Sequence, residues 1–428
     1  MLALLKKSLN NKYARGAFFL TVASFMTNFI NYIFYLIICR SLGPDGYGDI
    51  SALMSYIAIL SVPLSVISLY LIQKIASSKT NKFTYVSELE TYFWSKIKKY
   101  RFLIIATGLL TPFLPKITNL SGLISYSILP LLFLSVIGSI YDSFFQGLGL
   151  FFAFSVLGVV AVLIKLFGGF LTLTNYAGLL TVIIFLIISG IFKSLGSKIV
   201  LNREMAKKVN DKKILIQKRI LSLLKSRQFI LTFFSVVGTV ALGNLDIIFA
   251  KKFLDSHFAG IYSSWSLFAK IILYIIGPIL SISYIFFSDS HYSDKHDRMF
   301  LISLVVLLIF GICISVFYLN FAQFVVFIIF GGKFNEVVHR LSLAGLYGIL
   351  YSAIIYFNNY FLAKKSIISA LLPISLIFYA ISLLFITKNI DSLIMINIQF
   401  SSIIVIVYIL IAVFYFYRFN KQNVYYNT

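Results

Sequence analysis

Two lysines stand inside long apolar runs of this 428-residue chain, and they are the residues best suited to bind a ligand there. Lys165 lies within the run 149–172 and Lys270 within the run 258–285, while Arg40 closes an earlier run. A charge at such depth is costly, so it usually faces a protein interior or a hydrated cavity. These cations could attract an anionic group. The alternatives are that Lys165 snorkels to an interface, or that either lysine has a structural partner.

The composition identifies the surrounding runs as membrane spans. The chain is 60% hydrophobic and 12% charged, with a mean hydropathy of +0.95, whereas soluble domains carry about 25% charged residues. A helix of about 20 apolar residues crosses about 30 Å of hydrocarbon. We therefore predict an all-α polytopic membrane protein with about twelve transmembrane helices, near 16–39, 47–72, 101–117, 120–144, 149–172, 176–193, 228–250, 258–285, 299–319, 338–361, 366–387 and 396–417.

One apolar stretch, 321–332, is too short for an ordinary span. We expect it to be a re-entrant or interfacial continuation of the ninth helix. If it crossed the membrane, the number of spans would become odd and the C-terminus would change sides.

The distribution of basic residues predicts the orientation. With the N-terminus inside, 28 of the 37 Lys and Arg residues fall in inner segments, including 73–101 and 193–227, and only 7 in outer ones. This bias predicts a multi-pass protein of the cytoplasmic membrane with both termini in the cytoplasm. The net charge of +23 is thus mainly a topology signal and gives no support to nucleic-acid binding.

A basic segment divides the chain into two blocks. We predict a six-helix bundle over 1–192, a cytoplasmic linker over 193–227 and a second six-helix bundle over 228–428. The linker is either an interfacial helix on anionic lipid, around 212–225, or a plain charged connection. An offset of 215 residues aligns Pro63 with Pro278, which predicts parallel repeats about a pseudo-twofold axis normal to the membrane.

Four loose motifs carry a family resemblance. Arg40, Leu42, Gly43, Tyr47 and Gly48 form an Arg-x-Leu-Gly-x3-Tyr-Gly pattern after the first predicted helix. The second block contains Asn-x-Asp at 244–246, Ala-Gly-x-Tyr at 259–262 and FGGKF at 330–334. In these patterns and in its layout the chain resembles the Wzx-like polysaccharide flippases, a bacterial group within the superfamily of multidrug (MATE) and oligosaccharidyl-lipid transporters (MOP).

The resemblance implies a function. It implies alternating-access transfer of polyprenyl-pyrophosphate-linked oligosaccharide from the inner to the outer leaflet, for a surface polysaccharide such as O-antigen. A sugar and a pyrophosphate need a polar cavity to pass hydrocarbon. Lys270, Lys165 and Arg40 are then candidates for binding the pyrophosphate. The implied partners are the lipid-linked oligosaccharide, membrane lipids, and the polymerase and glycosyltransferases of the same pathway, with a monomeric transport unit.

Three further polar residues are candidates for the cavity. Asn28 and Asn31 share a helix face one turn apart and either hydrogen-bond sugar hydroxyls or hold helices together. Asp246, in the seventh predicted helix, either coordinates a coupling ion or contacts Lys251, Lys252 or Lys270. No cofactor, metal site or catalytic residue is expected, because the sequence contains no P-loop, metal-ligand cluster or nucleophile motif in a plausible context.

Other functions fit the sequence less well. A multidrug cation exporter of the same superfamily would be expected to carry carboxylates in its cavity, but no predicted span has an interior glutamate. A lipid II flippase would be expected to have two more C-terminal spans. A polysaccharide polymerase or ligase, which is an enzyme, would need a large outer loop bearing arginines.

Overall fold

The computed structural model describes residues 12–78, 81–174, 177–208, 227–288 and 296–426. Within these ranges every regular element is a helix, which confirms the predicted all-α class. Large apolar side chains cover much of the surface, for example Phe102 at 70% and Phe385 at 85% exposure. Such a surface suits lipid and not water.

The number of spans agrees with the prediction once two helices are counted correctly. Ten described segments are long and apolar enough to cross a membrane, and the bent pair α11–α12 makes an eleventh. One of the ten, Val22–Leu60, would be about 58 Å long if straight, about twice the hydrocarbon thickness. Gly43 divides it, because its φ of 69° and ψ of −169° are non-helical and favour glycine. Counting the two arms separately gives twelve.

The chain forms two compact units. Unit 1 contains residues 1–42 and 56–226, and unit 2 contains 43–55 and 227–428. The prediction assigned 1–192 to one bundle, whereas the structure groups the start of the second arm of α2, residues 43–55, with unit 2. The helices of unit 1 are α2 (Lys12–Leu60, shared), α3 (Val62–Ala76), α4 (Lys82–Lys99), α5 (Arg101–Thr107), η1 (Gly108–Phe113), α6 (Leu114–Thr118), α7 (Gly122–Tyr126), α8 (Ile128–Leu148), α9 (Phe151–Leu171) and α10 (Leu179–Ala206).

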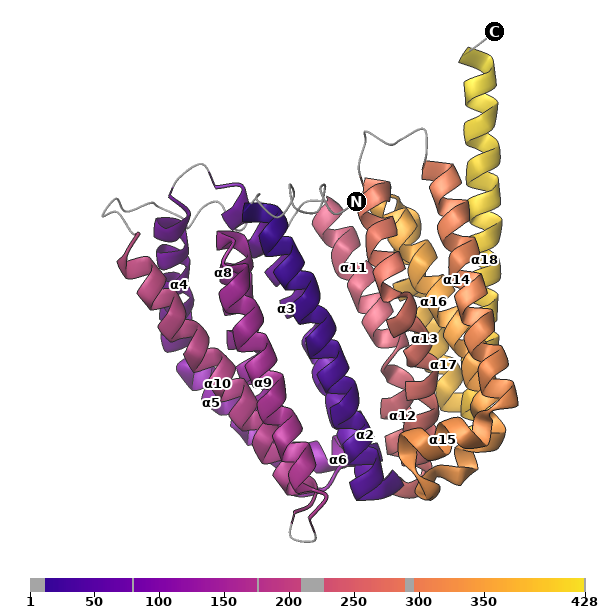
Figure 1. Ribbon diagram of the computed structural model, residues 1–428, viewed down its shortest axis with the longest axis horizontal. Coiled ribbons are helices and arrows are strands. Elements are labelled where there is room, and N and C mark those ends of the chain that lie inside the picture. The colour runs from indigo at the N-terminus through magenta and orange to yellow at the C-terminus, as the bar shows by residue number, and fades with distance from the viewer. Residues whose placement is uncertain (1–11, 79–80, 175–176, 209–226, 289–295, 427–428) are drawn as a thin grey trace. The chain divides into compact units, whose positions relative to one another are not determined.

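Unit 2 is built around α16, most of whose residues are buried. This helix packs against α13, α14 and α18. Figure 1 shows α18 extending past the other helices of the unit. The helices of unit 2 are α11 (Arg227–Leu242), α12 (Leu245–Phe253), α13 (Ser256–Ser288), α14 (His296–Asn320), α15 (Ala322–Phe330), η3 (Gly332–Arg340), α16 (Leu341–Ala363), η4 (Ile367–Ala370), α17 (Leu371–Phe385) and α18 (Ile390–Tyr426).

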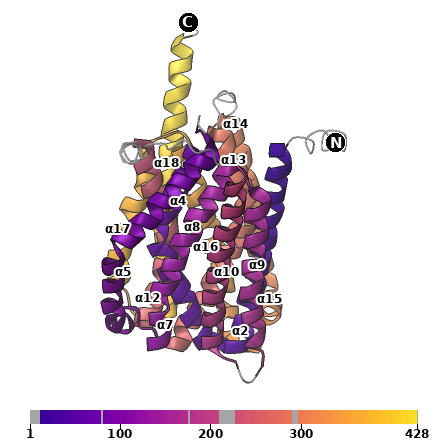
Figure 2. The same cartoon turned by 90° about the vertical axis from the view of Figure 1, so that its left-hand side faces the viewer.

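Three segments differ from, or refine, the sequence-based expectation. The inner loop expected near 73–100 contains the helix α4, whose polar and apolar residues alternate too closely for a hydropathy search. Figure 2 shows α4 leading into α5 on the face toward the viewer. Helix α10 continues to Ala206, inside the predicted linker, and the interfacial helix expected around 212–225 lies outside the described residues. The stretch 321–332 forms the nine-residue helix α15, too short to cross.

Cysteine labelling tests the orientation. Cysteines introduced at Lys82 and Lys208 should resist a membrane-impermeant thiol reagent in intact cells, because the charge bias places both in the cytoplasm. The native Cys39 is buried and Cys313 is exposed, so both are first replaced by alanine. A cysteine at Lys388, in an expected outer loop, is the positive control. Labelling of Lys82→Cys or Lys208→Cys from outside would contradict the predicted orientation and indicate the reverse one.

Candidate functional site

A break in the seventh span positions the polar residues of unit 2. Helices α11 and α12 meet at a bend of 40°, and Asn244 at the junction is non-helical with φ −137° and ψ −22°. A break leaves carbonyls at the end of the preceding helix without intrahelical partners. The Asn244 side chain satisfies one of them, because its Nδ2 donates to the Val240 carbonyl at 2.7 Å. The Asn-x-Asp motif therefore forms this bend.

Asp246 lies in the first turn of α12 and is completely buried. Its Oδ2 accepts a hydrogen bond from the Tyr262 hydroxyl at 2.7 Å. Tyr262 in turn accepts from Asn397 Nδ2 at 2.6 Å, and Asn397 accepts from the Tyr379 hydroxyl. Each donor in this series of hydrogen bonds thus points toward the Asp246 carboxylate. Its other oxygen, Oδ1, is buried without a hydrogen-bond partner among the described residues.

Lys270 lies midway along α13, close to the same bend. Its Cε would be 3.8 Å from a Cβ on Gly243, and the Tyr351 hydroxyl lies against the same glycine. The Lys270 side chain is partly buried, and no ion pair joins it to Asp246 among the described residues. Across the described ranges it has no hydrogen bond or ion pair.

Lys165 lies in unit 1, where its contacts among the described residues are all with uncharged groups. Its Nζ donates to Asn31 Oδ1 at 2.9 Å and lies 4.1 Å from the ring centroid of Phe34 and 5.0 Å from that of Tyr35. Amide and ring contacts stabilise an ammonium by about 0.5–2 kcal/mol each without cancelling its charge. The structure thus brings together two predicted site residues that are 134 positions apart.

The other predicted residues lie elsewhere. Asn28 is exposed one turn before Asn31, and Arg40 is exposed about three turns further along the same arm. Neither joins the group around Lys165. Asp246 contacts Tyr262 and Ser266 and not Lys251, which has a different partner.

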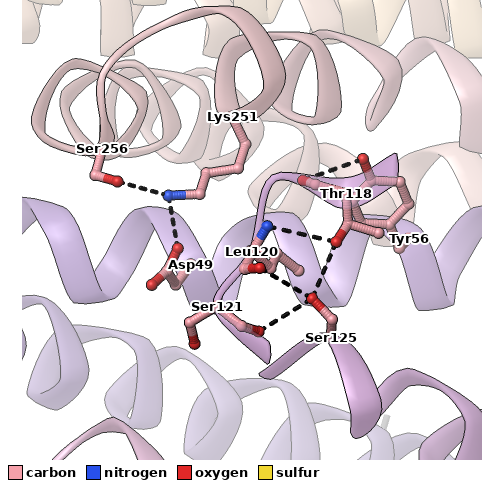
Figure 3. Close-up of polar contacts among 8 residues, drawn as sticks. All are labelled: Asp49, Tyr56, Thr118, Leu120, Ser121, Ser125, Lys251 and Ser256. Atoms are coloured by element: carbon pink, nitrogen blue, oxygen red, sulfur yellow. Dashed lines mark hydrogen bonds and ion pairs between the residues drawn. The ribbon is translucent and has the colours of Figure 1, made fainter. Parts of the chain in front are cut away.

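That partner is Asp49, and sequence reasoning missed the pair. Lys251 Nζ lies 2.6 Å from Asp49 Oδ1 and donates to Ser256 Oγ at 2.8 Å (Figure 3). The Lys251 side chain is only 4% exposed and that of Asp49 19%. The pair fixes residues 43–55, which we call the 43–55 segment, to α12 and α13. The sequence feature that could have indicated this pair is the position of an aspartate and a lysine at the ends of apolar runs.

The sequence motifs themselves meet at the 43–55 segment. A Cβ on Gly260 would lie 1.9 Å from the Pro44 carbonyl oxygen, and one on Gly48 would lie 2.9 Å from the Gly260 nitrogen. The Tyr47 ring contacts the rings of Phe330 and Phe334 at 6.2 and 6.3 Å between centroids. The glycines thus permit a close helix contact, and these motif residues have a structural role.

Figure 3 also shows a separate hydroxyl cluster in unit 1. The Ser125 hydroxyl lies 3.1 Å from that of Thr118 and donates to the carbonyls of Leu120 and Ser121 at 3.1 and 3.0 Å. It stabilises the turn between α6 and α7, where Asn119 has a positive φ of 55°. These neutral contacts stabilise the fold and offer no ligand site.

The structure also contains a pocket that lies apart from the predicted site residues. An open pocket of about 640 Å³ between α14, α15 and η3 contains none of the predicted site residues. Its lining includes Asn320, Phe324 and Asn335. In the described ranges, no group of three or more His, Cys, Asp or Glu side chains is arranged to hold a metal ion.

Solved structures share this fold, although no family model and no curated protein matches the sequence. An inward-facing multidrug resistance MATE family transporter of the MOP superfamily matches with a TM-score of 0.65 and 13% identity, over 92% of this chain and 96% of that one. The lipid II flippase MurJ, in an inward closed conformation, gives 0.64 and 16% over 92% and 87%. The eukaryotic MATE transporter AtDTX14 gives 0.59 and 11% over 94% and 96%. At identities this low, the TM-scores show that the chain shares the fold of these solved transporters and show nothing beyond the fold.

Proposed function

We propose that this protein is a MOP-type transporter that flips polyprenyl-pyrophosphate-linked oligosaccharide from the inner to the outer leaflet by alternating access. The fold supports transport, since the MATE and MurJ structures that share it are transporters and a flippase. The sequence motifs favour the oligosaccharide. The product would serve surface polysaccharide assembly.

The main support for an anionic cargo comes from two lysines within spans, Lys165 in unit 1 and Lys270 in unit 2. Among the described residues, neither of these two lysines is paired with a carboxylate. Lys270 has no hydrogen-bond partner there, and Lys165 contacts an amide and two rings. A pyrophosphate would supply the missing counter-charge to such a lysine.

Asp246 has a second role in this proposal. Its unpartnered Oδ1, buried beside a donor chain that satisfies only Oδ2, is a candidate for binding a coupling ion or a proton. The same carboxylate favours the alternative of a cation exporter, because it could bind a cationic drug directly.

A deletion strain of the host separates the two functions. Loss of the gene should stop surface polysaccharide export and cause lipid-linked oligosaccharide to accumulate on the inner leaflet, while tolerance to cationic drugs stays unchanged. Complementation with the intact gene is the control. Normal polysaccharide with lowered drug tolerance would instead establish the exporter.

A further inference from the structure

The junction of α4 and α5 carries a dense group of positive charges. Lys96, Lys98 and Lys99 end α4, and Arg101 begins α5 after Tyr100 interrupts the helix. All but Lys96 are exposed. Within the described chain, no carboxylate forms an ion pair with any of these four residues. We call them the α4–α5 basic group.

Aromatic rings hold these charges in place without neutralising them. Lys96 Nζ lies 5.1 Å from the Tyr92 ring centroid, and Lys99 Nζ lies 5.8 Å from that of Tyr100. The Arg101 guanidinium carbon lies 4.9 Å from the Phe102 ring. Cation–π contacts leave the full charge available to an anion. Lys98, Lys99 and Arg101 are exposed, so their charged ends are accessible.

The surface next to this group is suited to acyl chains. Helix α5 has no buried residue, and Phe102, Leu103 and Ile105 are 66–70% exposed. The apolar span begins at Arg101. A lipid whose chains lie along α5 would therefore place its phosphate beside the α4–α5 basic group.

The other side of α4 is anchored to the core of unit 1. Val86 and Leu89 pack with α3, α8 and α10, and buried Glu90 accepts a hydrogen bond from the Tyr141 hydroxyl at 2.7 Å. Trp94 Nε1 donates to the same hydroxyl at 3.3 Å, and Lys198 of α10 lies 4.9 Å from the Trp94 ring. The helix that carries the basic group is thus anchored to the core of unit 1.

We propose that the α4–α5 junction binds the headgroup of an anionic phospholipid of the bilayer. Opposite charge selects an anionic over a zwitterionic headgroup, since each basic residue at an anionic surface strengthens binding by about fivefold. The site stabilises the position of α4 against the membrane surface. It is independent of the cargo of the transporter.

Fluorescence of Trp94 can report lipid binding at this site, because the chain contains only two tryptophans and the other one can be replaced. The full-length Trp265→Phe variant, reconstituted in phosphatidylcholine vesicles, retains Trp94 as the sole tryptophan. Brominated phosphatidylglycerol at one fifth of the lipid should quench its fluorescence at least twofold more than brominated phosphatidylcholine at the same fraction. Replacing Lys96, Lys98, Lys99 and Arg101 by glutamine should abolish this difference.

Matched variants separate a site from general charge attraction. Replacing four basic residues of unit 2 by glutamine, at Lys252, Lys333, Lys364 and Lys388, should leave the twofold preference unchanged. If Trp265→Phe fails to fold, the difference in quenching between the unsubstituted chain and Trp94→Phe reports the same signal. Equal quenching by both lipids, or a preference that survives loss of the α4–α5 basic group, would overturn the proposal.

Discussion

Replacing Lys270 by alanine is expected to lower polysaccharide export by about 10- to 100-fold while the protein stays at normal abundance in the membrane. The reason is the loss of a charge-assisted hydrogen bond to the cargo, worth about 1.5–3 kcal/mol. Arginine at this position should restore part of the activity, because it keeps the charge and binds phosphate, though with a different geometry. Export of labelled polymer, normalised to immunoblot abundance, is the measurement.

Matched substitutions identify what Lys270 does. Lys270→Met keeps the aliphatic stem, so it should fail as Lys270→Ala does. Lys252→Ala, on the exposed face of α12, removes a lysine outside the proposed site and should export normally. Lys165→Ala should reduce export less, because Asn31 and the rings of Phe34 and Tyr35 remain at that site.

A double variant distinguishes ligand binding from a structural role. If Lys270 served only to balance Asp246, then Lys270→Met combined with Asp246→Asn should recover export, since neither charge is left alone. Recovery of export by the double variant would therefore exclude cargo binding by Lys270. Normal export by Lys270→Ala at normal abundance would refute the cationic site.

The spans were predictable because hydrophobic length is a local property. A run of about 20 apolar residues must cross the membrane as a helix, whatever its neighbours. The same reasoning located Lys165 and Lys270, since a charge inside such a run is visible in the sequence. It failed for α4, whose helical character depends on one buried face and not on mean hydropathy.

The pairings were not predictable because they depend on which helices become neighbours. Asn28 and Asn31 share a helix face in the sequence, yet only Asn31 reaches Lys165, and Asn28 is exposed. Lys251 was a candidate partner for Asp246, but it lies toward the opposite end of α12 from Asp246 and binds Asp49. The proposed twofold relation between the halves, with Pro63 and Pro278 at equivalent places, stays a prediction.

The ion pair of Asp49 and Lys251 should show a strongly asymmetric response to mutation. Asp49→Ala would remove the carboxylate that lies 2.6 Å from the Lys251 ammonium, whose side chain is only 4% exposed. Removing one partner of a buried pair costs about 3–5 kcal/mol, because the remaining charge is uncompensated. Lys251→Met should cost less, since the Asp49 side chain is 19% exposed and can take up water. Thermal unfolding of the purified protein in detergent measures both effects.

The double variant decides whether the pair is the cause. Asp49→Ala combined with Lys251→Met removes both charges, so it should be more stable than Asp49→Ala alone. Asp45→Ala is the matched control, because this exposed aspartate lies one turn earlier on the 43–55 segment and should leave the unfolding temperature nearly unchanged. Additive losses in the double variant would mean that each residue acts separately. The 43–55 segment would then be held to the rest of unit 2 by the contact of Gly48 with Gly260 and by the aromatic contacts of Tyr47, and not by charge.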